Sequence, residues 1–148
     1  MTVYLDGVDV WDGESYGTYA VTAEGIVAFA EQYDPQPFHT DPDRAADSIY
    51  GGLIASGWHT AAMSMRLFVD GFLSETASMG SKGLDRLRWP APVRPGDELT
   101  VHSTVLDTEV VDDDKGWVRW QVDTTADGDD GADRDVFSME ALVLVGRD

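Results

Sequence analysis

The sequence contains no cysteine, only three histidines and no long uninterrupted apolar run. The missing thiols exclude disulfide bonds, zinc-thiolate sites and a cysteine nucleophile. A membrane-spanning helix needs about 20 predominantly apolar residues, and no segment approaches that composition. We therefore expect neither a membrane span nor a signal peptide, and we predict a cytoplasmic protein.

Basic residues are scarce as well, lysine above all. The 148 residues include 28 Asp and Glu against 10 Lys and Arg, a formal net charge of −18, and only Lys82 and Lys115 are lysines. Such a charge repels nucleic acid and anionic membranes, so neither is an expected partner. The Asp-rich, Lys-poor composition resembles that of haloarchaeal proteins, in which molar salt screens self-repulsion. A very soluble mesophilic protein is the alternative.

Helix signals lie in the first half of the chain. Thr22 is a suitable N-cap for a helix from Ala23 to Tyr33, whose apolar residues recur at helical spacing. Asp34-Pro35 ends that helix, because a residue before proline is pushed out of the α region. Pro42 begins a short helix through Ala46. The apolar stretch from Leu53 to Phe72 predicts a long helix that is buried on all sides.

The second half of the chain has the composition of β-strands, with loops at Asp112–Gly116 and Ala126–Asp135. Strands are predicted at Gly83–Trp89, Leu99–Val111, Trp117–Thr125 and Val136–Val145, with one or two more around Val8–Val10 and Ser15–Val21. In the best-alternating strand, Val118, Trp120 and Val122 share one face. This order predicts a single α+β domain over residues 1–148, in which a curved antiparallel sheet wraps the long helix. Its exposed edges favour a homodimer.

The densest group of ionisable residues lies between Tyr33 and Pro42. Asp34 and His39 are five residues apart, and two prolines that bracket Gln36 stiffen the segment between them. A carboxylate and an imidazole directed at one water suit general acid–base catalysis. On spacing alone, the alternative is that Asp34 caps a turn and that His39 is an ordinary loop histidine.

This segment resembles the signature of the MaoC-like dehydratases, which include (R)-specific enoyl-CoA hydratases. That motif has an Asp, an Asn two residues later, then Pro, an apolar residue and His, followed by Asp/Glu-Pro and Ala. The matching residues here are Asp34, Pro37, Phe38, His39, Asp41, Pro42 and Ala45, and Gln36 stands where Asn is usual. Two later blocks, Gly51–His59 and Gly83–Asp97, also resemble the family, and Gly57 aligns with a glycine at the start of its central helix.

The resemblance implies a hot-dog fold and a hydratase or dehydratase of CoA thioesters that needs no metal or cofactor. Asp34 and His39 would hold a water that adds to C3 of a trans-2-enoyl thioester, giving an (R)-3-hydroxyacyl product. The Gly57 N–H would stabilise charge on the thioester oxygen. Gln36 would position the loop or the substrate, and Ser56 would be either a further donor or only a helix N-cap.

Several other residues leave alternatives open. His59 is either a supporting donor or a core histidine, whereas Trp58 and Trp89 are predicted to be core residues and His102 a surface residue. The basic side chains are candidates either for coenzyme A phosphate contacts or for ion pairs with neighbouring aspartates. These are Arg66, Lys82, Arg86, Arg88 and Arg94, of which we select Arg88 and Arg94 as substrate contacts. A hot-dog thioesterase and a non-catalytic acyl-thioester binding subunit are the alternative functions.

Overall fold

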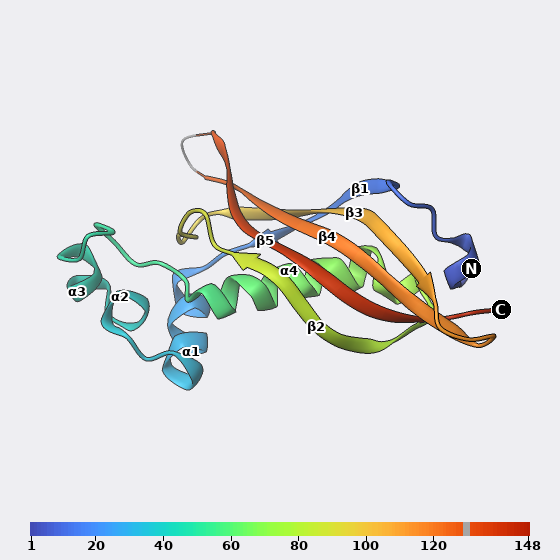
Figure 1. Ribbon diagram of the computed structural model, residues 1–148. Coiled ribbons are helices and arrows are strands. Elements are labelled where there is room, and N and C mark those ends of the chain that lie inside the picture. Colours follow the sequence, from blue (N-terminus) through green and yellow to red (C-terminus); the bar gives the residue numbers. More distant parts are fainter. Residues whose placement is uncertain (129–130) are drawn as a thin grey trace.

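One long helix lies along one face of a single antiparallel sheet in the computed structural model, which describes residues 1–128 and 131–148 (Figure 1). The elements in chain order are η1 (Leu5–Gly7), β1 (Gly13–Ala20), α1 (Ala23–Tyr33), α2 (Pro37–Thr40), α3 (Pro42–Ala46), α4 (Gly57–Gly71), η2 (Leu73–Glu75), β2 (Ser78–Arg88), β3 (Glu98–Val110), β4 (Lys115–Asp127) and β5 (Asp133–Gly146). The predicted α+β class is confirmed, as are the helices Ala23–Tyr33 and Pro42–Ala46.

The sheet has five strands in the order β1-β3-β4-β5-β2, so β1 and β2 form its edges. Side chains of β4 alternate between the two faces, and Val118, Trp120 and Val122 point toward the helix as predicted. Phe68 of α4 packs against the Trp120 ring, with ring centroids 5.6 Å apart. The alternation along β4 gives the sheet one apolar face, and burial of this face against α4 stabilises the fold through the hydrophobic effect.

Several predicted boundaries were wrong. Val8–Val10 is not a strand. The strand predicted from Gly83 begins earlier, at Ser78, because Gly80 and Gly83 lie within an irregular edge strand, β2, and do not precede it. Lys115 and Gly116, predicted to lie in a hairpin loop, begin β4. The predicted loop from Ala126 to Asp135 is shorter, since β4 ends at Asp127 and β5 starts at Asp133. Residues 129–130 of that loop lie outside the described residues.

The central helix begins later than predicted, at Gly57 and not at Leu53. The preceding segment is held in extended form, because the Ile54 N–H donates to the Phe38 carbonyl at 3.1 Å and the Ala55 N–H to the Val93 carbonyl at 2.9 Å. Ser56 then caps the helix. These hydrogen bonds fix the course of the segment between α3 and α4.

The prediction that the long helix is buried on all sides was wrong. Its inner face packs on the sheet through Met63, Leu67 and Phe68, which are almost fully buried. Its outer face exposes Trp58, Met65 and Val69, although these residues are as apolar as the core. Within the described ranges, no helix is long and apolar enough to cross a membrane.

Candidate active site

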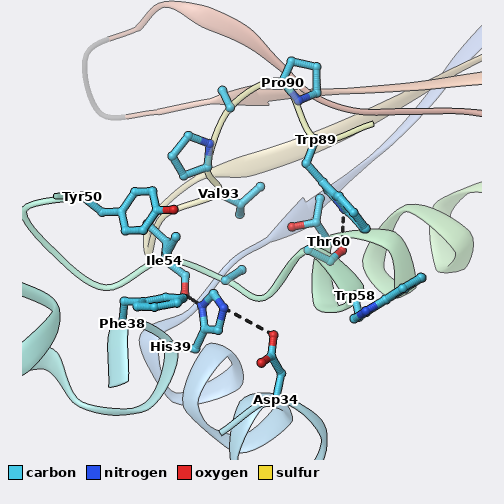
Figure 2. A pocket seen from close by; sticks show the side chains of 14 residues that line it. Asp34, Phe38, His39, Tyr50, Ile54, Trp58, Thr60, Trp89, Pro90 and Val93 are labelled. Atoms are coloured by element: carbon cyan, nitrogen blue, oxygen red, sulfur yellow. Dashed lines mark hydrogen bonds and ion pairs between the residues drawn. The ribbon is translucent and has the colours of Figure 1, made fainter. Parts of the chain in front are cut away.

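The structure brings Asp34 and His39 together beside the N-terminal end of α4 (Figure 2). Asp34 is the C-cap of α1, and His39 lies in the short helix α2, which the sequence analysis assigned to a stiff loop. Pro37 occupies the first turn of α2, where its missing N–H costs no helical hydrogen bond. This turn places the His39 Nε2 atom 3.4 Å from Asp34 Oδ2.

The orientation of His39 is fixed by a main-chain acceptor. The ring is buried, and its Nδ1 lies 2.8 Å from the carbonyl oxygen of Ile54. Because a carbonyl oxygen can only accept, Nδ1 carries the proton and donates it. The other ring nitrogen, Nε2, lies on the side of Asp34, where in its unprotonated form it can take a proton from a water.

Asp34 is held as a carboxylate by two neighbouring side chains. Gln36 Nε2 donates to Oδ1, and Ser56 Oγ donates to Oδ2, both at 2.7 Å. The pKa of Asp34 is lowered, first by the hydrogen bond from Gln36, then by the hydrogen bond from Ser56 and by electrostatic attraction to His39, against an opposing effect of burial. Gln36 thus contacts the carboxylate directly, which gives a physical role to the residue that stands in place of Asn.

Ser56 connects this carboxylate to the central helix. Its side chain is fully buried, its Oγ accepts from the Trp58 N–H at 3.3 Å, and the same hydroxyl donates to Asp34. Of the two roles left open for Ser56, the structure shows that of the helix N-cap, and a contact with a substrate stays a prediction. One hydroxyl therefore fixes both the start of α4 and the position of Asp34.

Gly57 is the first residue of α4. No acceptor for its N–H occurs among the described residues, as is usual for the first N–H groups of a helix. A side chain at this position would collide with the indole ring of Trp89, since an ideal Cβ would lie 2.6 Å from Trp89 Cε2. The Trp89 Nε1 also donates to the Gly57 carbonyl at 2.7 Å.

Asp34, His39 and Gly57 line one cavity of about 490 Å³. Most of its wall is apolar or aromatic, and no Lys or Arg of the described residues lines it. The remaining lining residues are Phe38, Tyr50, Ile54, Ala55, Trp58, Thr60, Trp89, Pro90, Ala91, Pro92 and Val93. A cavity of this size with a few convergent polar groups is typical of a small-molecule site. Of the other predicted site residues, Gln36 and Ser56 lie behind Asp34, and Arg88 and Arg94 lie outside the cavity wall.

The prediction that Trp58 and Trp89 are core residues was wrong. They are 59% and 40% exposed, their rings meet edge to face at 5.4 Å, and both line the cavity (Figure 2). Sequence reasoning missed them because tryptophan is common in cores. The available signal was the placement of Trp89 next to Pro90, at the predicted end of a strand.

Four of the five basic candidates fall into two groups, and the fifth, Lys82, lies over the Trp117 ring with its Nζ 4.3 Å from the ring centroid. Arg66 pairs with the neighbouring Asp70, as the ion-pair interpretation predicts, whereas Arg86 pairs with a glutamate of β5, Glu140. Arg88 and Arg94 have no carboxylate within ion-pair distance in the part of the chain that the structure describes. Arg94 donates to the Tyr50 carbonyl at 2.8 Å, and Arg88 is exposed with one bond to the Leu87 carbonyl. Their contact with a substrate stays a prediction.

The two other histidines lie outside the catalytic pair. His59 is buried and stacks on Phe29 at 4.8 Å, burial lowers its pKa, and its Nδ1 has no partner among the described residues. The core interpretation of His59 is therefore confirmed. His102 is exposed on β3 and hydrogen-bonds to Ser15, also as predicted. In the described ranges, no three His, Asp or Glu side chains are arranged to hold a metal ion.

The fold and the site together define a hot-dog domain with an Asp/His pair at the start of its central helix. The MaoC like domain model matches residues 13–126. The chain is 33% identical to 3-hydroxyacyl-thioester dehydratase Z of Mycobacterium tuberculosis, over 72% of this chain and 71% of that protein. The chain belongs to the MaoC-like dehydratase family, as the resemblance of its motif predicts.

Other relatives agree with this family and fold. A MaoC-like dehydratase from Rhodospirillum rubrum is 39% identical, with a TM-score of 0.85 over 99% of this chain and 98% of that one. The (R)-hydratase from A. caviae shares the fold, with a TM-score of 0.68 at 24% identity over 92% and 96% of the chains. The uncharacterized protein YdeM of Bacillus subtilis is 34% identical over 60% of this chain, and the match spans 63% of its own length.

Replacing Gln36 by methionine should raise the pKa of Asp34. Methionine has a similar length but no donor, so the carboxylate loses the bond that lowers its pKa most. In a carboxyl NMR titration, the Asp34 midpoint should move toward the ordinary value of about 3.9. In the native protein, the lowered pKa gives stability that is complete above that value and is lost as pH falls through the folded-state pKa. Glu31→Gln, on the exposed side of α1, is the control, and an unmoved midpoint would show that Gln36 does not act on Asp34.

Proposed function

We propose that the protein interconverts trans-2-enoyl thioesters and (R)-3-hydroxyacyl thioesters of coenzyme A, using Asp34 and His39 to move the elements of water. The observation that carries this proposal is that the Asp34/His39 pair and Gly57, whose N–H has no acceptor among the described residues, line one cavity with otherwise mainly apolar walls. The names of the relatives, a 3-hydroxyacyl-thioester dehydratase and an (R)-hydratase, support the reaction and its stereochemistry.

In the hydration direction, a water donates hydrogen bonds to Asp34 Oδ2 and to the lone pair of His39 Nε2. One O–H bond of the water breaks while its oxygen bonds to C3, and the C2=C3 electron pair moves toward the thioester carbonyl. The Asp34/His39 pair holds the released proton and returns it to C2, so no proton is gained or lost overall. Asp34 is ionised at neutral pH, as an ordinary aspartate is, and its lowered pKa favours this state further; in this state it can orient the water.

Charge that develops on the thioester oxygen needs a donor that is already in place. The Gly57 N–H lies in the first turn of α4, where the helix dipole is positive, and it has no competing acceptor in the described part of the chain. A backbone donor of this kind contributes ~10²–10³ in rate.

The carrier proposed is coenzyme A, whose phosphates must bind to a chain of net charge −18. In the part of the chain that the structure describes, no Lys or Arg lines the cavity, so the phosphates would remain outside while the acyl group enters. Arg88 and Arg94 flank the wall segment Trp89–Val93 and lack carboxylate partners among the described residues. They are therefore the candidates for phosphate contact.

A homodimer is part of the same proposal. The edge strand β2 has one open side, and the outer face of α4 exposes Trp58, Met65 and Val69. A second copy of the chain would cover both features, including Trp58, which lines the cavity. Sedimentation velocity is expected to give twice the chain mass of 16.2 kDa.

The proposed reaction is tested with purified protein and crotonyl-CoA, at low salt and in molar KCl because of the high negative charge. Loss of the conjugated enoyl absorbance and recovery of (R)-3-hydroxybutyryl-CoA on a chiral column are the expected results. A thiol reagent is included in parallel. Release of free coenzyme A would indicate a thioesterase, and tight binding without turnover would indicate a binding subunit; either result overturns the proposal.

A further inference from the structure

We propose that Trp89 is a positioning residue, which fixes the first turn of α4 so that the Gly57 N–H faces the bound thioester. This inference rests on the proposed function, in which that N–H is the donor to the thioester oxygen. Nothing in the motif Asp34 to Pro42 indicates a role for Trp89, which lies 32 residues beyond Gly57. The inference comes from the contacts of its indole ring (Figure 2).

The first contact is steric. The indole lies against the Cα of Gly57, so closely that an added Cβ would be 2.6, 2.9 and 3.0 Å from three of its ring atoms. Such distances are incompatible with any side chain at residue 57 unless the ring moves. The position of the Trp89 ring therefore requires glycine at residue 57, whether or not a ligand is bound.

The second contact is a hydrogen bond. Trp89 Nε1 donates to the Gly57 carbonyl at 2.7 Å, at a point where helix ends otherwise tend to fray. The carbonyl and the Cα of the same residue are thereby held by one rigid ring with only two side-chain torsions. The Gly57 nitrogen is bonded to the same Cα, so restraint of the Cα and the carbonyl limits the directions in which its N–H can point.

The ring is itself held by its surroundings. Trp89 directly follows β2, whose last residue, Arg88, pairs with Ser138 of β5. Its ring lies 6.4 Å from Phe137, a buried residue of β5, and 5.4 Å from Trp58. Contacts with the sheet therefore hold the Trp89 ring in place, and the ring in turn holds the N-terminal end of α4. Because the ring is 40% exposed, burial of apolar surface alone does not account for its placement.

The first test compares Trp89→Phe and Trp89→Leu with the wild-type chain in enoyl-CoA hydration. Phenylalanine keeps much of the packing but has no N–H, so we expect kcat to fall about tenfold while KM changes by less than about twofold. The fall is bounded by the ~10²–10³ that loss of a complete donor costs, and leucine should approach that bound. Trp11→Phe is the control, because Trp11 is an exposed tryptophan outside the cavity. If Trp89→Phe raised KM and left kcat unchanged, the ring would contact substrate and would not position the donor.

The second test needs no activity. Gly57→Ala is introduced into the wild-type chain and into Trp89→Leu, and thermal unfolding of all four proteins is followed. The melting temperature should fall by several degrees in the wild-type background and by much less when the smaller leucine leaves room for the methyl group. Equal falls in both backgrounds would refute the steric part of the proposal. A wild-type protein without turnover would instead refute the proposed function, while the unfolding cycle would still report on the contact.

Discussion

Asp34→Asn and His39→Ala should each lower kcat for enoyl-CoA hydration by ~10²–10⁴, the range expected for loss of a general acid or base. Asparagine keeps the shape of Asp34 but has no negative charge, and an NH2 donor replaces one of the two acceptor oxygens that can bind the reacting water. Alanine removes the Nε2 lone pair, which lies 3.4 Å from Asp34 Oδ2 in the native chain. Since both groups hold one water, the double variant should be little slower than the slower single variant.

These variants must be shown to fold before their rates are interpreted. Circular dichroism and a thermal melt would be recorded for each, because His39 also donates to the Ile54 carbonyl and Asp34 accepts from Ser56. Glu31→Gln is a matched control, since it removes an exposed carboxylate from the same helix as Asp34. Near-native turnover by a folded double variant would exclude the proposed catalytic pair.

The parts of the site that the sequence predicts are those with local causes. Thr22 caps α1 through a hydrogen bond from the Gly25 N–H, and Asp34-Pro35 ends the helix where the proline rule places its end. Asp34 and His39 are near in sequence, so the short segment between them limits their separation. The predicted strands were correct in number after Gly83 because alternation within one strand is also local.

The parts that the sequence does not predict depend on contacts between distant segments. Trp89 and Gly57 meet only after β2 and α4 have packed together, and neither residue's neighbours indicate the other. Trp58 illustrates a second limit. An apolar side chain predicts burial, but the sequence does not show whether that burial is within the same chain or against a ligand or a second molecule. The start of α4 at Gly57 likewise depends on bonds from residues 54 and 55 to Phe38 and Val93.

The cavity wall from Trp89 to Val93 depends on one buried carboxylate beyond its end. Asp97 is only 4% exposed, its Oδ2 accepts from the Arg94 N–H at 2.7 Å, and it forms an ion pair with Arg134. Arg134 also donates to the Pro92 carbonyl at 3.1 Å. Asp97 therefore closes the turn that begins at Arg94, after the cavity wall. It also holds Arg134 in the position from which Arg134 binds the Pro92 carbonyl.

Replacing Asp97 by alanine should destabilise the protein by about 3 kcal/mol, which is at the lower end of the cost of breaking a buried ion pair. For a chain of this size, that loss lowers the melting temperature by roughly 6–12 °C. Glu98→Gln, which removes the adjacent exposed carboxylate, should change it by less than about 2 °C. A cycle with Arg134→Met separates the two roles of Asp97. If the ion pair dominates, Asp97→Ala costs much less in the Arg134→Met background; if the bond from Arg94 dominates, the cost is the same in both backgrounds. We expect the first result, because a charge left without its partner costs more than a single neutral donor does.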